Sequence, residues 1–110
     1  MKRLIGVLLF AAAPAIAGPL PARTVQDLYG TCQRNEPTCI AYIAGVFDAL
    51  VVVSVSKQHD PLFAVCADST VTYGAAQQAF FNWAPRHPEH WNKSQLVGVT
   101  LSLQETWPCR

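Results

Sequence analysis

Apolar side chains recur at helical spacing in the middle of the chain. Between residues 39 and 51 they occupy one face of a 3.6-residue repeat: Cys39, Ile40, Ile43, Val46, Phe47, Leu50 and Val51. This period predicts an amphipathic helix whose apolar side faces a core. The run from Val51 to Val55 also has the β-branched composition of a strand, so a strand is the alternative for the end of this helix.

Polar residues before the apolar repeats predict where the first two helices begin. Thr24 has the side chain of an N-cap, and Asp27 falls in the first turn, where a carboxylate is favourable. They predict a first helix over about 25–32. A polar turn ending in Pro37 follows, and we expect Thr38 to cap the core helix.

Two further helices are predicted in the second half of the chain. Thr72 is placed to cap a helix over about 73–86, and a last helix is expected over about 94–106. Their inner faces are expected to carry Ala76, Ala79, Phe80, Trp83, Leu96, Val99, Leu103 and Trp107. Together the four segments predict a small all-α bundle of four to five helices.

The N-terminus has the form of a secretory signal peptide over residues 1–17. Lys2 and Arg3 precede an apolar run, and Ala15-Ile16-Ala17 is a small-x-small cleavage site. We therefore expect residues 18–110 to form one exported domain, with the periplasm as its compartment.

Composition excludes several classes of protein. The chain has 110 residues, a formal net charge of +1 and only 14% charged residues, without a cluster of Lys and Arg. It lacks the cationic surface that nucleic-acid binding requires. The apolar segment 39–55 carries Gly45, Asp48 and Ser54 and is expected to fall short of a membrane span. After signal removal we expect neither nucleic acid nor membrane as a partner.

Four cysteines lie in the expected mature chain: Cys32, Cys39, Cys66 and Cys109. An even number in an exported chain favours disulfides over zinc, because the closest two are further apart than in a zinc knuckle. Of the three pairings that four cysteines allow, we favour Cys32 with Cys39 and Cys66 with Cys109. The short and long loops that these bonds close are worth roughly 2.5 and about 4 kcal/mol in unfolded-chain entropy.

Candidate chemistry is sparse. The run His87-Pro88-Glu89-His90 brings two imidazoles and a carboxylate together in sequence, but Pro88 interrupts the helix on which metal-binding histidines usually lie four residues apart. We therefore expect no metal and no other cofactor. The chain has no G-x-S-x-G nucleophile elbow, and its cysteines are expected to be oxidised, so we do not expect an enzyme.

A few residues point instead to contacts. Gly45 weakens the core helix unless another helix approaches closely, within the chain or across a dimer. Asp48 is expected to be a solvated flank residue or the partner of a capping or interface donor. Phe81 and Trp91 lie off the predicted inner faces, and exposed rings of this kind are favoured anchors for a protein partner.

The order and spacing of several short motifs is distinctive. They are Asp27-Leu28, Cys32, Cys39-x-x-Tyr42-Ile43-x-Gly45-Val46-x-Asp48-Ala49, Phe63-x-x-Cys66, Val71-Thr72, His87-Pro88-Glu89 and Trp107-Pro108-Cys109. In this arrangement the chain resembles the Rap/Tai family of immunity proteins, which protect bacteria from type VI secretion amidase effectors. The resemblance covers nearly all of the expected mature chain.

The resemblance implies a helical periplasmic protein with intramolecular disulfides, often a homodimer, that binds a peptidoglycan amidase and blocks its active-site groove. Two polar segments at predicted helix ends are our candidates for the contact. The first consists of Lys57, Gln58, His59 and Asp60, and the second includes Arg86, His87, Glu89 and Trp91.

Two other functions remain open from the sequence. A periplasmic acid-stress chaperone is also small, helical and disulfide-bonded, but it needs a pH-triggered exposure of apolar surface, and the chain has few titratable groups to drive one. A helical binding domain without a toxin partner is the second alternative.

Overall fold

The computed structural model describes residues 23–56 and 61–109. The elements in that part of the chain are α1 (Val25–Gln33), α2 (Pro37–Ser54), η2 (Pro61–Phe63), α3 (Tyr73–Trp83), η3 (Ala84–Arg86), η4 (Pro88–His90) and α4 (Gln95–Thr106), where η denotes a 3₁₀ helix. The described residues form no strand, so the strand alternative for Val51–Val55 is wrong and the all-α class is confirmed. The predicted signal peptide, residues 1–17, lies outside the described residues.

The first two helices begin for different local reasons. At α1, the Asp27 N–H donates to the Thr24 hydroxyl and the Thr24 N–H donates to the Asp27 carboxylate, at 3.1 and 3.0 Å. This capping box confirms the predicted start. The predicted Thr38 cap is wrong: α2 begins at Pro37, because proline suits the first helical position, where no N–H is needed. Asn35, with φ of 55°, turns the chain between the helices.

The third helix changes its pitch near its end. Thr72 caps α3 as predicted, accepting from the Ala75 N–H at 3.1 Å. The chain stays helical to Arg86, but its last turn is the 3₁₀ helix η3. Pro85 explains the change, because it lacks the N–H that would continue the α-helical ladder. The fourth helix follows Ser94 as predicted, with the Ser94 hydroxyl accepting from the Val97 N–H.

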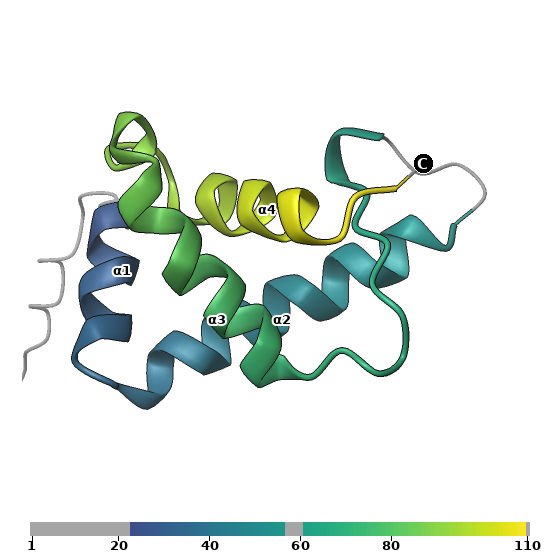
Figure 1. The fold of residues 1–110 in the computed structure, drawn as a ribbon, viewed down its shortest axis with the longest axis horizontal. Coiled ribbons are helices and arrows are strands. Elements are labelled where there is room, and N and C mark those ends of the chain that lie inside the picture. The colour runs from purple at the N-terminus through teal and green to yellow at the C-terminus, as the bar shows by residue number, and fades with distance from the viewer. Residues whose placement is uncertain (1–22, 57–60, 110) are drawn as a thin grey trace, which may run out of the picture.

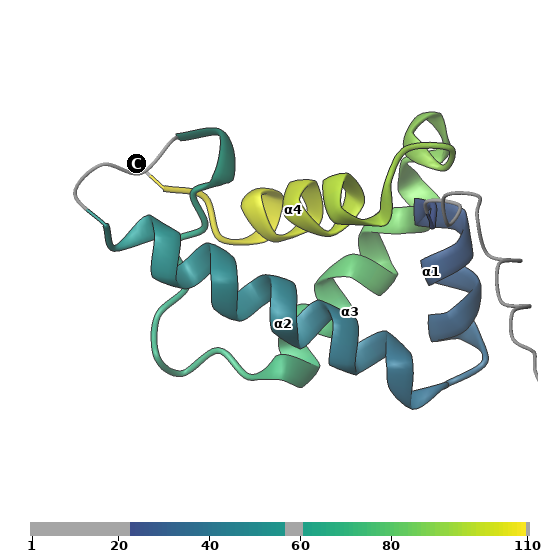
Figure 2. The same cartoon turned by 180° about the vertical axis from the view of Figure 1, so that it is seen from behind.

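The helices pack around one core, with α3 on one side of it and the pair α2 and α4 on the other. In Figure 1, α3 crosses the pair formed by α2 and α4, and α1 stands at one end of the bundle. Seen from behind in Figure 2, α2 and α4 lie toward the viewer, with α3 beyond them. The buried core between these helices includes Val25, Leu28, Ile43, Phe47, Leu50, Ala76, Phe80, Trp83, Val99 and Leu103.

A glycine permits the contact between α1 and α4. A Cβ placed at Gly98 would lie 2.4 Å from Cγ2 of Val25, a distance that real side chains do not adopt. The start of α1 is also tied to the start of α4, because the Val25 N–H donates to the Lys93 carbonyl at 2.9 Å. The two helix ends are therefore held together by packing and by backbone hydrogen bonds.

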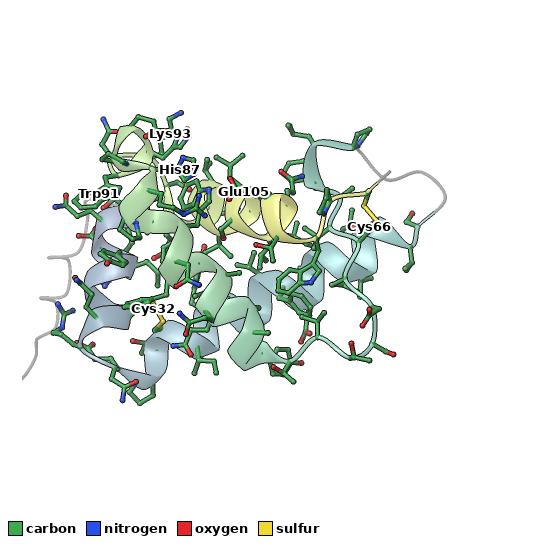
Figure 3. The ribbon with its side chains drawn as sticks, viewed as in Figure 1. Cys32, Cys66, His87, Trp91, Lys93 and Glu105 are labelled. Carbon is green, nitrogen blue, oxygen red and sulfur yellow. A yellow bond between two sulfur atoms is a disulfide. The ribbon has the colours of Figure 1, made fainter. Side chains whose placement is uncertain are left out.

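Both favoured disulfides are confirmed. Cys32 pairs with Cys39 across the turn between α1 and α2, and Cys66 pairs with Cys109 at the end of the described chain. All four cysteines are therefore bonded. Figure 3 shows the labelled Cys32 and Cys66 at opposite ends of the bundle, so each bond fastens a different end.

Candidate partner-binding surfaces

The second predicted contact segment folds into two consecutive 3₁₀ turns. His87 lies between η3 and η4, and the His90 N–H donates to the His87 carbonyl at 3.0 Å. This turn brings the two imidazoles close together, with ring centroids 6.0 Å apart. Both rings stack on Trp83, with centroid distances of 4.6 and 5.6 Å. The turn therefore has a fixed shape supported by the core.

Charged groups surround this turn. Arg86 Nη2 donates to the Glu105 carboxylate at 3.0 Å, and the other Glu105 oxygen lies 3.5 Å from Nε2 of His87. Figure 3 shows His87 and Glu105 next to each other where the turn meets α4. On the other side of the ring, Nδ1 of His87 lies 3.1 Å from Glu89 Oε2. The pKa of Glu89 is lowered, first by a backbone hydrogen bond and then by the contact with His87.

Hydrogen bonding to the protein does not account for both imidazoles. Nε2 of His87 and Nδ1 of His90 are buried and have no hydrogen-bond partner within the described residues. Buried polar atoms are normally satisfied, and each exception calls for a physical explanation. Hydrogen bonds within the protein therefore do not fully explain the position of the rings. Stacking on Trp83 also contributes to it.

Trp91 and Phe81 do not stand out from the surface as expected. Both are half-buried against the core, and each lies beside the ring of Tyr29, with centroid distances of 6.1 and 5.4 Å. The Trp91 indole N–H donates to the Ala84 carbonyl at 2.7 Å. The expectation of exposed rings was wrong because Tyr29 of α1 packs beside both rings, and the 3₁₀ turns bring Trp91 back to α1, where the Gln26 N–H donates to the Trp91 carbonyl at 3.1 Å. Trp91 therefore stabilises the turn, while Arg86 and Glu89 are its exposed groups.

The first predicted contact segment, Lys57, Gln58, His59 and Asp60, lies outside the described residues. Its neighbours in the chain are the end of α2 and the 3₁₀ helix η2. These elements lie at the opposite end of the bundle from η3 and η4 (Figure 1).

One helix exposes an unusually apolar face. The segment Pro37–Ser54, which is all of α2, is long and apolar enough by composition to cross a membrane, with a mean hydropathy of 1.8. The expectation that this apolar segment falls short of a membrane span was therefore wrong on length and composition. Core helices of soluble proteins pass the same test when they are mostly buried, but only 22% of this segment is buried. Ile40, expected on the inner face, is exposed. Much of the apolar surface of α2 is therefore available to a partner.

The apolar surface continues onto α4 through Leu96. This side chain was expected in the core, but 47% of it is exposed, so that prediction was wrong. It lines two shallow grooves. One, of about 390 Å³, runs along α2 over Tyr42, Gly45 and Ala49, and the other, of about 270 Å³, lies between η2 and α4.

The groove between η2 and α4 is formed by residues that the sequence did not predict to form a contact surface. Leu62, Phe63 and Val97 are all exposed and line it together with Leu96. Gln104 fixes η2 in place, because its amide donates to the carbonyls of Leu62 and Ala64 at 2.7 and 3.2 Å. An apolar residue in a loop has no periodicity, so its exposure is visible only in the folded chain.

Gly45 has open space above it. A Cβ placed there would meet nothing within 4 Å, so no other part of the described chain approaches closely. The expectation of a close helix within the chain was therefore wrong, and the alternative of an approach by a second molecule remains a prediction. The close approach that a glycine permits occurs at Gly98 instead.

Asp48 lies on the other side of α2, beside a third groove of about 550 Å³. Asp48 was expected to be solvated or to pair with a donor. It is exposed and it accepts a hydrogen bond from the Tyr73 hydroxyl, which lies 2.9 Å from both carboxylate oxygens. This hydrogen bond raises the pKa of Tyr73, because it favours the protonated phenol. The pair links α2 to the start of α3.

Comparison with known proteins identifies the chain's relatives. The family model described as Rap1a immunity proteins matches residues 24–109, nearly all of the chain that the structure describes. Neither a curated protein nor a solved structure matches the chain. The family match agrees with the resemblance carried by the cysteines and by the motifs around Gly45 and His87. The chain therefore belongs to the Rap1a immunity protein family and is an immunity protein for a secreted effector.

Proposed function

We propose that this protein is exported to the periplasm and there neutralises a type VI secretion peptidoglycan amidase by covering its active-site groove. The observation that carries the proposal is the match to Rap1a immunity proteins over residues 24–109. The protein acts by binding and not by catalysis. This family match also favours immunity over the chaperone and partnerless-domain alternatives.

Two features support an exported protein. All four cysteines are paired, and disulfides persist in oxidising compartments such as the bacterial periplasm. The N-terminal sequence also has the charged, apolar and small-residue parts of a signal peptide. An amidase delivered to the periplasm would meet its inhibitor in the same compartment.

We place the effector contact on the groove between η2 and α4. Tight protein contacts need apolar anchors at the centre and polar residues at the rim. Phe63, 42% exposed, and Leu96 offer such anchors on opposite sides of this groove. The predicted contact segment 57–60, which is polar and charged, immediately precedes η2 in the chain.

We assign the second groove, over Gly45, to a second copy of the chain. Small residues along α2, including Ala41 and Ala49, would let another helix approach the backbone closely. The open space above Gly45 fits this contact. A homodimer would bury part of the apolar face that α2 leaves exposed.

The exposed charges of the second predicted segment offer a competing effector site. Arg86 belongs to η3 and Glu89 to η4, and these turns lie at the far end of the bundle from η2, which carries Phe63 (Figure 1), so substitutions can separate the two surfaces. The apolar groove is favoured because charged rim contacts alone contribute little affinity.

The test is a calorimetric titration of the oxidised chain 18–110 against the amidase encoded beside its gene. We expect nanomolar binding for the wild type and about 30-fold weaker binding or more for Phe63→Asp, which buries a charge in the contact. Ile40→Asp is the matched control, because Ile40 is an exposed apolar residue of α2 outside both grooves. It should leave the Kd unchanged.

Two results would overturn parts of this proposal. Wild-type affinity in Phe63→Asp, together with weakened binding in a variant carrying Arg86→Glu and Glu89→Lys, would move the contact to the turn at η3 and η4. Absence of wild-type binding to a folded, active amidase would refute the amidase as partner.

A further inference from the structure

A metal at His87, Glu89 and His90 was not expected because Pro88 interrupts the helix, but the fold brings the two histidines together. Histidines three residues apart on an α-helix do not share a face as well as those four apart. Here His87 precedes the 3₁₀ turn that Pro88 begins, and the His90 N–H closes the turn by donating to the His87 carbonyl at 3.0 Å. The ring centroids of His87 and His90 are accordingly 6.0 Å apart, on one side of the turn.

The donor atoms converge. Oε2 of Glu89 lies 3.1 Å from Nδ1 of His87 and 3.8 Å from Nε2 of His90, and one ligand atom from each of the three residues lies within 4.8 Å of the others. A tetrahedral zinc centre with bonds of about 2.1 Å holds its ligand atoms about 3.4 Å apart. Small ring rotations therefore suffice to bring the three donors to coordination distance.

The surroundings resemble the outer shell of a metal site. A coordinating histidine commonly turns its second ring nitrogen toward a carboxylate, which fixes the ring and its tautomer. Nε2 of His87, buried and without a hydrogen bond, lies 3.5 Å from a Glu105 oxygen, and Arg86 holds that carboxylate from the other side. Stacking of both imidazoles on buried Trp83 further limits their rotation.

We propose that His87, Glu89 and His90 form a zinc-binding site with Nδ1, carboxylate and Nε2 as its three protein ligands. Two imidazoles and a carboxylate are a ligand set that zinc favours, with its fourth position left to water. Bound zinc links η4 to the end of η3 and stabilises the fold around Trp83. The site does not depend on the proposed effector contact, which lies at the other end of the bundle.

The experiment is a calorimetric titration of the tag-free, oxidised chain 18–110 with ZnCl₂, with unfolding temperature measured in parallel. We expect one zinc per chain with a Kd in the micromolar range or below. At a zinc concentration about 100 times the Kd, the unfolding temperature should rise by about 10 °C or more. MgCl₂ at the same concentration should have no effect, because magnesium prefers oxygen ligands.

Variants separate this site from adventitious binding. Glu89→Gln, at an exposed position, should weaken zinc binding at least tenfold without unfolding the protein. Glu105→Gln should weaken it about tenfold through the orientation of His87. His59→Gln, which alters the remaining histidine of the chain, is the matched control and should leave the Kd unchanged.

A second readout does not depend on any variant. In NMR spectra, zinc should shift the imidazole signals of His87 and His90 and leave those of His59 in place. The proposal is overturned if zinc does not bind at 1 mM, if Glu89→Gln binds as tightly as the wild type, or if the His59 signals respond instead.

Discussion

Two glycines illustrate how single residues take their meaning from the fold. Gly45 stands out in the sequence because it interrupts an apolar helix, yet a Cβ there meets nothing within 4 Å. Gly98 has no feature in the sequence that marks it as important, although a Cβ at this position would collide with Val25. The sequence shows that a glycine lies in a helix, but only the crossing of α1 and α4 determines which one is needed.

The two glycines should therefore respond oppositely to alanine. Gly98→Ala should lower the free energy of unfolding by about 1–3 kcal/mol, because the core has no room for the added methyl group. At a concentration at which the chain is monomeric, Gly45→Ala should raise it by up to about 1 kcal/mol, because alanine favours the helix and the space above Gly45 is open within one chain. Urea unfolding monitored by circular dichroism measures both. Equal losses in the two variants would contradict the packing described here.

At the level of single side chains, the sequence predicted the surroundings of the polar residue Asp48 better than those of the aromatic residue Trp91. Asp48 was expected to be solvated or to accept from a donor, and it does accept from Tyr73. Trp91 was expected to be exposed, but its indole donates to Ala84 inside the fold. A helical projection cannot place Trp91, because the two 3₁₀ turns before it reset the direction of the chain.

Among the elements, helix starts were predictable where a side chain caps the backbone. Thr24, Thr72 and Ser94 all accept hydrogen bonds from the first turn of their helices. The start of α2 was misplaced because Pro37 begins that helix by its fixed backbone angle and without a side-chain cap. Helical period also outweighed the β-branched composition near the end of α2, where the chain remains helical.

The capping box of α1 predicts a pH-dependent stability. Hydrogen bonds from the backbone and the side chain of Thr24 lower the pKa of Asp27. A carboxyl group with a lowered pKa stabilises the fold above its unfolded-state pKa of about 3.9, and that stability is lost as the pH falls through the folded value. Asp27→Asn should therefore destabilise the protein at pH 7 and have little effect at the lowest pH at which the wild type stays folded.

The measurement for this prediction is urea unfolding of the wild type and Asp27→Asn between pH 7 and pH 2.5. The difference between the two free energies of unfolding should shrink toward the acidic end. A difference that stays constant over this range would mean that the Asp27 charge does not contribute to the cap.

On the scale of the whole molecule, the disulfides fasten the two ends of a small bundle. The bond between Cys32 and Cys39 closes a short loop, whereas that between Cys66 and Cys109 spans a sequence separation of 43 residues. A cross-link that closes a longer loop removes more entropy from the unfolded chain. The two bonds should therefore contribute unequally to stability.

Replacing each pair with alanine tests this inequality. Loss of the bond between Cys66 and Cys109 should cost about 4 kcal/mol, and loss of the bond between Cys32 and Cys39 roughly 2.5 kcal/mol. Chemical unfolding of the two double variants under oxidising conditions gives the comparison. A larger loss at Cys32 and Cys39 would show that burial of that bond outweighs loop length, since both of its cysteines are buried.

The fold class was predictable because helical period and helix caps are local features of the sequence. The favoured disulfide pairing is confirmed, but the sequence alone left three pairings possible. The surfaces were less predictable. The apolar groove depends on Leu62 and Phe63, which follow no helical pattern, and on Leu96, which the pattern placed in the core. Which apolar residues stay exposed is decided by how α3 covers one side of α2 and α4 and leaves the other open (Figure 2).

An inhibition assay tests most directly whether the protein neutralises a peptidoglycan amidase. Peptidoglycan cleavage by the neighbouring amidase is followed while the oxidised chain 18–110 is added in increasing amounts. We expect cleavage to fall linearly and to stop near one chain, or one dimer, per amidase. Full amidase activity in the presence of an excess of folded, disulfide-bonded protein would contradict it.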